Sequence, residues 1–344
     1  MKEVSKMVAM DNGRCLTLAA APLKVLETIF NYLDGNDLLN TLAVCRSFNN
    51  VISSSNKQMD KIRLNVDHSM DDMDELKLLM KATNRSYQHL SVSQDYIYFL
   101  KGLDYFNWKS IRVEGMTFDK YLLDFLKQFV VTLEEIEFDQ VYIDQYGLYT
   151  KAAYFRNLDT FIINGNDDDA VFILSTFVES ISQFKNLKMP QAAFGRSYME
   201  FFDSRPMIEK LYLTSAEPAS TTDTENSLNL ISDSLKELTM ECFENSTMQF
   251  IWREMIVLEK LYIKIQLHED NNPGNFSLRE NENIKELYIL NKMLPDHVFN
   301  EISIATPHLE TWRFAKLNLR LKTYSLDAQL FGYETSKMYN YTYF

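Results

Sequence analysis

The chain has 344 residues, 46% of them hydrophobic and 13% aromatic, which is enough for a sizeable core in one large or two modest domains. Its 35 basic and 48 acidic residues give a formal net charge of −13, which argues against nucleic-acid binding because such modules carry a basic patch or stripe. The three cysteines, Cys15, Cys45 and Cys242, are too widely spaced to predict a disulfide framework or a zinc site, so we expect a reducing compartment.

Residues 1–20 precede the first periodic segment. The run from Cys15 to Ala21 resembles the end of a signal peptide, but it is short, and the polar residues 11–14 interrupt the apolar stretch. We therefore expect a flexible leader over residues 1–20. No apolar run in the chain approaches the roughly 18 residues of a membrane-spanning helix, so the sequence predicts a soluble protein without a membrane partner.

Residues 21–52 have the pattern of two or three short amphipathic helices. After Pro22, which suits a first helical turn, apolar residues recur at steps of three and four: Val25, Leu26, Ile29, Phe30 and Leu33. Residues 34–37 predict a turn with an N-cap at Asn36 or Asp37. The second helix then carries Leu38, Leu39, Leu42 and Val44. So small a unit cannot bury all of these side chains within itself, and we expect it to pack on a partner.

This segment resembles an F-box, the helical module that docks on the Skp adaptor of cullin–RING ubiquitin ligases. The resemblance rests on the spacing of Pro22-Leu23, Ile29-Phe30, Leu33, Asp37-Leu38, Val44-Cys45-Arg46 and Phe48. Ala21 and Lys24 stand where the family usually has leucine and an acidic residue, and Phe48 stands where tryptophan is commoner. The resemblance implies that the Skp adaptor contacts Pro22, Leu23, Leu26, Ile29, Phe30, Leu33, Leu38, Leu39, Val44, Cys45 and Phe48. The alternative is that these helices only cap the domain that follows, and the two roles are compatible.

Residues 59–319 repeat the pattern apolar-x-x-apolar-x-apolar. Eleven copies start at intervals that average 25 residues, at Met59, Tyr87, Trp108, Leu133, Leu158, Phe184, Ile208, Leu235, Leu258, Ile284 and Leu309. The pattern resembles a leucine-rich repeat, which implies an α/β fold: a curved solenoid with parallel strands on its concave face and helices on its convex face. We expect long loops at residues 215–227 and 268–283, which are polar, and a cap for the open edge at residues 320–344.

The residue between the last two apolar positions of each copy should project from the concave face, because side chains alternate along a strand. These middle residues are Arg112, Glu137, Ile162, Lys188, Tyr212, Thr239, Tyr262, Tyr288 and Arg313. Tyrosines are common interface anchors, although they also simply favour strands. Acidic residues around Glu137 could attract a basic partner or form an ordinary solvated surface. As candidate target-binding residues we select Glu135, Glu137, Tyr212, Tyr262, Tyr288 and Arg313.

No motif in the sequence indicates catalysis, a cofactor or a metal. There is no Gly-rich phosphate loop, no nucleophile elbow and no metal-binding spacing of histidines or cysteines. The resemblance therefore implies a non-catalytic substrate receptor of a Skp–cullin–F-box ubiquitin ligase, which binds the Skp adaptor, works with the cullin–RING subunits and presents a target protein that the sequence does not identify. We expect such a protein in the cytoplasm, the nucleus or both. The alternative is a leucine-rich-repeat scaffold that binds proteins without recruiting a ligase.

Overall fold

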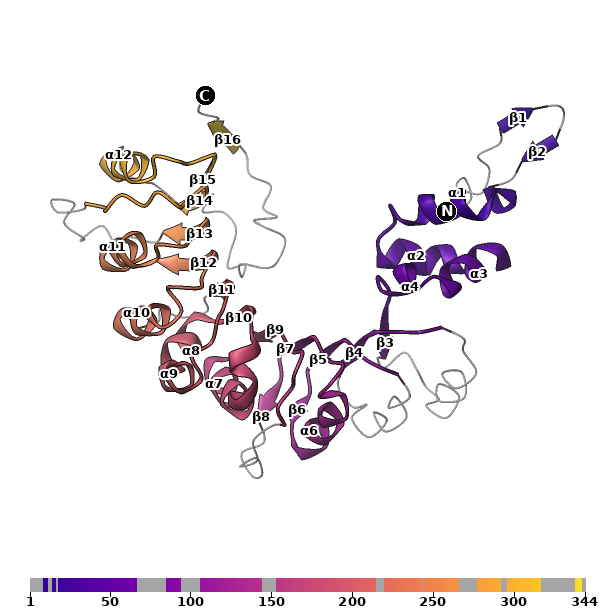
Figure 1. The fold of residues 1–344 in the computed structure, drawn as a ribbon, viewed down its shortest axis with the longest axis horizontal. Helices are drawn as coiled ribbons and strands as arrows, with labels where there is room; N and C mark the ends of the chain where they lie inside the picture. The colour runs from indigo at the N-terminus through magenta and orange to yellow at the C-terminus, as the bar shows by residue number, and fades with distance from the viewer. Residues whose placement is uncertain are drawn as a thin grey trace.

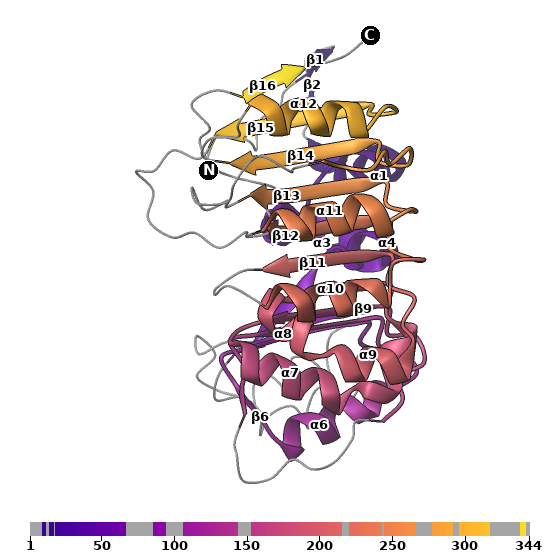
Figure 2. The same cartoon turned by 90° about the vertical axis from the view of Figure 1, so that its left-hand side faces the viewer.

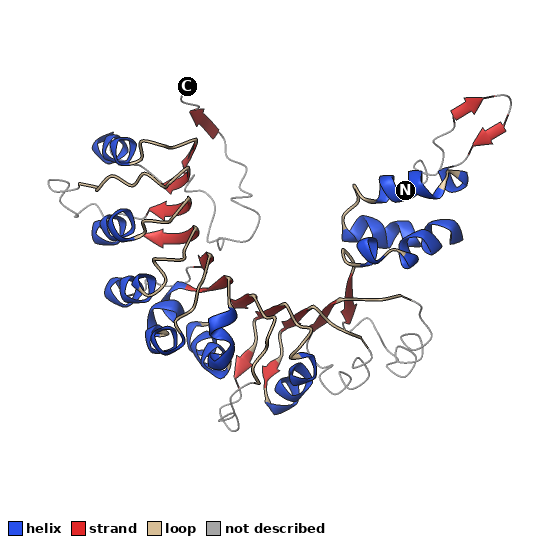
Figure 3. Ribbon diagram, viewed as in Figure 1, coloured by secondary structure: helices blue, strands red, loops and turns tan. Residues whose placement is uncertain are grey.

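The chain is seen in a computed structural model, which describes residues 9–11, 14–16, 18–66, 85–93, 106–143, 153–214, 220–242, 244–265, 277–291, 296–316 and 338–341. A group of helices forms the N-terminal end of a horseshoe, and a long curved sheet forms the rest (Figure 1). Strands line the inner face and helices the outer face, as Figure 3 shows by colour. The predicted architecture is confirmed.

The N-terminal unit contains a hairpin, a 3₁₀ turn and four helices. Its elements are β1 Ala9–Asp11, β2 Arg14–Leu16, the 3₁₀ turn Leu18–Ala20, α1 Leu23–Phe30, α2 Gly35–Leu42, α3 Arg46–Ser54 and α4 Asn56–Met59. Strands β1 and β2 pair antiparallel, so the segment predicted as a flexible leader contains regular structure. The Asn12-Gly13 dipeptide between the two strands is of the kind that favours tight hairpin turns, a signal the prediction did not use.

Helix α2 begins earlier than predicted. Asp34 is its N-cap, and the Asp34 carboxylate accepts a hydrogen bond of 2.8 Å from the Asp37 backbone N–H, so the expected cap at Asn36 or Asp37 is wrong. The early start has a packing reason. Gly35 lies against the backbone of Lys61, where a Cβ atom would collide with the Lys61 carbonyl oxygen. Glycine therefore lets the first turn of α2 approach the segment that leads into the sheet.

In the described ranges the main sheet has twelve strands. In chain order they are β3 Arg63–Val66, β4 His89–Ser93, β5 Ser110–Glu114, β7 Glu135–Asp139, β9 Thr160–Asn164, β10 Asn186–Pro190, β11 Lys210–Thr214, β12 Glu237–Cys242, β13 Lys260–Ile265, β14 Glu286–Asn291, β15 Thr311–Lys316 and β16 Met338–Tyr341. The first eleven lie side by side in sequence order and are parallel, one for each predicted copy. Strand β16, within the predicted cap, pairs antiparallel with β15. A second sheet pairs β6 Thr117–Phe118 with β8 Tyr142–Ile143.

The predicted register holds for ten copies and is wrong for the first. Leu211 lies beside Leu238 and Leu261 beside Leu287, as equal positions of the repeat should. In β3, however, Leu64 rather than Ile62 lies beside Leu90, a shift of two residues. The reason is that Met59 ends helix α4, so Met59 and Ile62 are buried at the junction with the helices instead of serving as the first strand.

Helices cover the convex side of the sheet from β5 onward (Figure 2). The elements are α6 Lys120–Leu126, the 3₁₀ helix Lys127–Phe129, α7 Asp167–Thr176, the 3₁₀ helix Val178–Gln183, α8 Gln191–Arg196, α9 Tyr198–Ser204, α10 Thr221–Asn229, α11 Asn245–Glu254 and α12 Asp296–Ala305. Helices α6, α7 and α12 bury apolar residues against the strands, as the spacing predicts. Among the described residues no helix has both the length and the apolar composition to cross a membrane.

Helix α10 corrects the loop predicted at residues 215–227, of which residues 215–219 lie outside the described residues. Ser220 caps α10, and Thr224 and Ser227 are buried in spite of their polarity. The Ser227 hydroxyl donates to the backbone carbonyls of Phe194 and Gly195 at 3.1 and 3.2 Å. Small hydroxyl residues thus let α10 pack closely on α8, a geometry that composition alone does not show. The other predicted loop, residues 268–283, lies mostly outside the described residues.

The centre of the core is a cluster of phenylalanines between the strands and the convex helices. The ring of Phe177, after α7, lies 5.1 Å from that of Phe161 and 5.5 Å from that of Phe155, measured between centroids. It also contacts Phe118 and Phe138, and all five rings are fully buried. One side chain therefore joins residues from three neighbouring copies.

Replacing Phe177 with alanine should lower the free energy of unfolding by about 3–5 kcal/mol, because it leaves a cavity that four neighbouring rings border. Urea denaturation followed by circular dichroism measures the change. Tyr142→Ala, at an exposed aromatic on β8, is the control and should shift the midpoint little. Equal shifts for the two variants would contradict a core role for the cluster.

Candidate functional site

The structure divides the predicted adaptor-contact residues between the interior and the surface. Leu26, Phe30, Leu38 and Phe48 are buried, and the Phe30 and Phe48 rings meet edge to face at 5.3 Å. The residues Ile29, Leu33, Leu39 and Cys45 are half-buried. Pro22, Leu23 and Val44 are exposed, Leu23 to 55% and Val44 to 58%. The sequence alone does not show which of these residues are buried and which are exposed, because all of them belong to one periodic apolar pattern.

The apolar surface of the helices is accessible although their other side is packed. Val25 on α1, which was not among the predicted contact residues, is also exposed, to 45%. We call Pro22, Leu23, Val25 and Val44 the apolar F-box surface. Exposed apolar side chains gathered on one small unit are typical of a protein-binding site.

Polar contacts fasten the helices to the start of the sheet. The Lys61 ammonium donates to the backbone carbonyls of Asn31 and Leu33 at 2.7 and 2.9 Å, beyond the last turn of α1. The Gln58 side chain donates to the Asn31 side chain at 2.9 Å. A cation at this end of α1 is favourable because the carbonyls there carry the negative end of the helix dipole. The helices are therefore held against the strand that opens the solenoid.

The predicted middle residues do form one continuous row across the concave face. Arg112 lies beside Glu137, Lys188 beside Tyr212, and the pairings continue strand by strand to Tyr288 beside Arg313. The row also passes through Ile162, Thr239 and Tyr262. The candidate target-binding residues thus share one face, but they lie in two groups of different chemistry.

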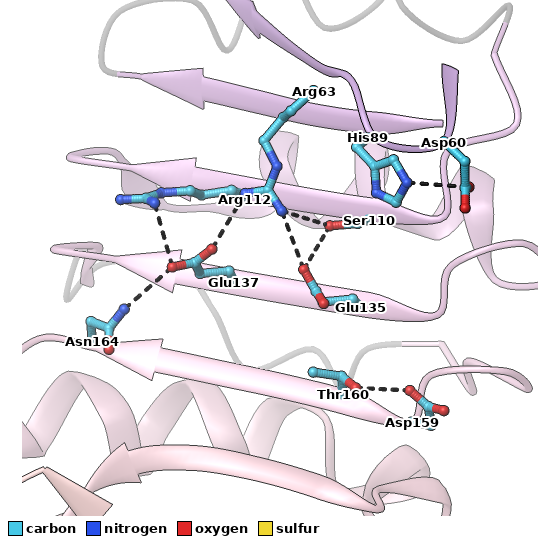
Figure 4. A network of polar contacts seen from close by, with 10 residues as sticks. All are labelled: Asp60, Arg63, His89, Ser110, Arg112, Glu135, Glu137, Asp159, Thr160 and Asn164. Atoms are coloured by element: carbon cyan, nitrogen blue, oxygen red, sulfur yellow. Dashed lines mark hydrogen bonds and ion pairs between the residues drawn. The ribbon is translucent and has the colours of Figure 1, made fainter. Parts of the chain in front are cut away.

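The acidic group is engaged within the protein by two arginines (Figure 4). Arg63 on β3 reaches across two strands to the carboxylates of Glu135, at 3.3 Å, and Glu137, at 3.5 Å. Arg112 contacts Glu137 at 3.7 Å and Asp139 at 2.5 Å. We call Arg63, Arg112, Glu135, Glu137 and Asp139 the arginine network. The prediction missed Arg63, because the row of middle residues began at Arg112 and did not include the first copy, in which Arg63 lies between Ile62 and Leu64.

The aromatic group forms a stack towards the C-terminal end of the sheet. The rings of Tyr262 and Tyr288 are nearly parallel, with centroids 4.4 Å apart, and the Arg313 guanidinium lies 5.1 Å from the Tyr288 centroid. Burial raises the pKa of Tyr262 to about 12, and Tyr288 and Glu237 add to the rise. Tyr262 is only 7% exposed, so the stack meets solvent mainly through the half-buried Tyr288 and the exposed Arg313.

The lysines that border the concave face are mostly paired with glutamates. Lys264 contacts the buried Glu241 at 2.5 Å, and Lys260 contacts Glu286 at 2.7 Å. Further pairs join Lys236 to Glu209, Lys210 to Glu237 and Lys285 to Glu259, at 3.1–3.8 Å. These pairs cross from one copy to the next and neutralise the borders of the sheet.

Comparison with known proteins places the N-terminal helices in a family. Residues 22–58 match the F-box domain family, a span that extends beyond the predicted segment through α4. The chain therefore carries an F-box domain, followed by a solenoid with the period and parallel strands of leucine-rich repeats. Among solved structures it is similar to the leucine-rich repeat-containing protein LegL7 from Legionella pneumophila, with 12% identity, a TM-score of 0.44, and coverage of 78% of this chain and 86% of that one. None of the curated proteins matches the sequence.

Replacing Arg112 with methionine should lower the free energy of unfolding by about 1–3 kcal/mol, because Glu137 and Asp139 would keep their charges without this partner. Urea denaturation measures the loss. Adding Glu137→Gln should recover part of it, since one uncompensated carboxylate is then removed. Strictly additive losses in the double variant would contradict the coupling.

Stability should fall between about pH 10 and about pH 12, and Tyr262 should contribute to the fall. An unfolded tyrosine releases its proton near pH 10, whereas folded Tyr262 holds its proton to about 12, so rising pH favours the unfolded chain across that range. Tyr262→Phe should therefore lose less stability than the wild type between about pH 9 and about pH 11, measured as urea midpoints. The exposed Tyr142→Phe is the control and should behave like the wild type. An equal loss in Tyr262→Phe would contradict the assignment.

Proposed function

We propose that this chain is a substrate receptor of a Skp–cullin–F-box ubiquitin ligase. Its F-box domain would hold the Skp adaptor, its solenoid would hold a target protein, and the other ligase subunits would transfer ubiquitin. The chain itself would contribute no catalytic residue, and it would act in the cytoplasm, the nucleus or both. F-box domains generally serve as such adaptors, and leucine-rich repeats generally bind proteins.

The observation that carries the proposal is the apolar F-box surface. The F-box core is already complete, with Leu26, Phe30, Leu38 and Phe48 buried, so Leu23, Val25 and Val44 are not needed to build it. These residues remain exposed, although Lys61 holds the end of α1 at the start of the solenoid. Burying them against an adaptor would gain roughly 25 cal/mol for each Å² of apolar area removed from water.

The concave face supports the second half of the proposal. Its middle row runs unbroken over the parallel strands and offers the aromatic stack Tyr262, Tyr288 and Arg313. Rigid aromatic side chains and arginine are enriched among the residues that carry binding energy at interfaces. The convex face is covered by helices, so the concave face is where a target meets the strands directly.

A charge placed on the apolar F-box surface should abolish adaptor binding without unfolding the domain. Val44→Asp and Leu23→Asp should each reduce capture of purified Skp adaptor by the full chain at least about tenfold, because binding would bury an unpaired carboxylate. Pull-down and calorimetric titration measure the change. Leu26→Asp would be a poor test, since Leu26 is only 2% exposed and its replacement disrupts the core.

The matched control is Val131→Asp on the solenoid, the same substitution at a valine of 57% exposure. It should bind the adaptor like the wild type. If the wild-type chain captures no adaptor, the ligase assignment fails and the remaining candidate is a repeat scaffold that binds proteins without recruiting a ligase. If Val131→Asp weakens capture as much as Val44→Asp does, adaptor binding does not occur at the F-box surface.

A further inference from the structure

The concave face has a hollow near its middle that reaches the strand next to the aromatic stack, since Thr239, which lines the hollow, lies beside Tyr262. Strands β9 to β12 surround it, and its volume is about 180 Å³. The lining includes Ile162, Lys188, Lys210, Tyr212, Glu237 and Thr239. A water molecule occupies roughly 30 Å³ in the liquid, so the hollow has room for one apolar side chain of a bound peptide.

The exposed surface of the hollow is mainly apolar, although most of the residues that line it are polar or charged. Ile162 is the one aliphatic side chain of the middle row from Arg112 to Arg313, and it is half-buried where its neighbours in the row are charged, polar or aromatic. Nearby polar groups already bond to each other, since the Asn186 side chain donates to the Thr160 hydroxyl at 3.0 Å. The hollow thus offers an apolar contact rather than a set of free hydrogen-bond donors.

Lys188 is the charged group that distinguishes this hollow. Lys210 at the same rim is 3.8 Å from Glu237, and other lysines along the sheet have carboxylate partners too. Within the described ranges Lys188 has no such ion pair, and its ammonium instead lies 5.2 Å from the centroid of the Tyr212 ring. The half-buried Lys188 therefore keeps a positive charge available beside an apolar hollow, in a chain whose net charge is −13.

The acidic side chains of the concave face are less available to a ligand than Lys188 is. The acidic residues that could have attracted a basic partner, Glu135 and Glu137, are compensated by the arginine network. The uncompensated charge beside the hollow is thus cationic, although the protein as a whole is acidic. Charge complementarity at this site therefore favours an anionic ligand.

We propose that the hollow binds an acidic peptide segment of the target, with one apolar side chain seated over Ile162 and an adjacent aspartate or glutamate paired with Lys188. This inference rests on the proposed function, because it names the chemistry of the target that the concave face receives. The Lys188 ammonium would keep its position over the Tyr212 ring and gain a charge-assisted hydrogen bond to the carboxylate.

A random dodecapeptide phage library, selected on the immobilised full chain, tests the proposal. Sequences with an acidic residue next to an apolar residue should be enriched. The best peptide, synthesised and labelled, should bind Lys188→Glu at least about tenfold more weakly than the wild type in a fluorescence anisotropy titration. Selection on Lys188→Glu should enrich a basic residue in place of the acidic one.

The matched control is Lys185→Glu, an identical charge reversal at an exposed lysine just before β10 and outside the concave rows. It should leave binding within about twofold of the wild type. Ile162→Thr, which keeps the branched shape of the side chain, should weaken binding when the peptide's apolar residue is present and have little effect when that residue is alanine.

Enrichment without an acidic preference, or none at all, overturns the inference, and so does equal weakening by Lys185→Glu and Lys188→Glu. A peptide that binds only when it carries phosphoserine, and not with aspartate or glutamate there, overturns the assignment of a carboxylate. Capture of the Skp adaptor is measured on the same preparations. A chain that binds acidic peptides but no adaptor contradicts the ligase role alone, whereas a chain that binds the adaptor but no acidic peptide contradicts this inference alone.

Discussion

The solenoid depends on burial that neighbouring copies share. A single copy has one strand and one crossover, too little to enclose its own apolar residues, so each copy completes the core of the next. Phe177 shows this directly, because its ring is packed by phenylalanines of its own copy and of the two copies before it. The backbone adds to the dependence. At the start of each strand of the main sheet from β5 to β15, two successive N–H groups donate to a single carbonyl of the preceding copy, as those of Glu134 and Glu135 donate to that of Lys109. The packing of the core and the backbone hydrogen bonds therefore favour the same alignment of neighbouring strands.

The F-box domain takes the place of a preceding copy beside the first strand of the main sheet. The first strand needs a neighbour on its outer side, and the helices take this place through the buried Met59 and Ile62 and through the contacts of Lys61 with the end of α1. The close approach at Gly35 leaves little space between α2 and the segment entering the sheet. The F-box domain therefore has a structural role in the solenoid as well as the proposed role in binding an adaptor. The two uses draw on different residues, since Met59 and Ile62 are buried at the junction with the sheet while Leu23, Val25 and Val44 stay exposed, which is why so small a unit carries so many apolar residues.

Much of this arrangement could be predicted from the sequence, because period and alternation are local signals. The eleven strands and the middle row from Arg112 to Arg313 follow from counting apolar positions. What escaped prediction depends on contacts between distant residues. The polar segment before Leu228 becomes helix α10 because its small side chains fit against α8, and Arg63 pairs with residues more than seventy positions away. The division of the F-box residues into buried and exposed sets also required the packed helices.

The paired charges bordering the strands have a further consequence, for folding. The two residues at the start of successive strands read Glu209-Lys210, Lys236-Glu237, Glu259-Lys260 and Lys285-Glu286, so the order of the signs reverses from each copy to the next. Ion pairs such as Lys236–Glu209 and Lys260–Glu286 form because the neighbouring copy carries the reversed order. If a folding chain skipped one of these four copies and stacked on the next but one, like charges would face each other at the starts of the strands. Alternating charges therefore penalise the misassembly to which a chain of similar units is most exposed, the omission of a single unit.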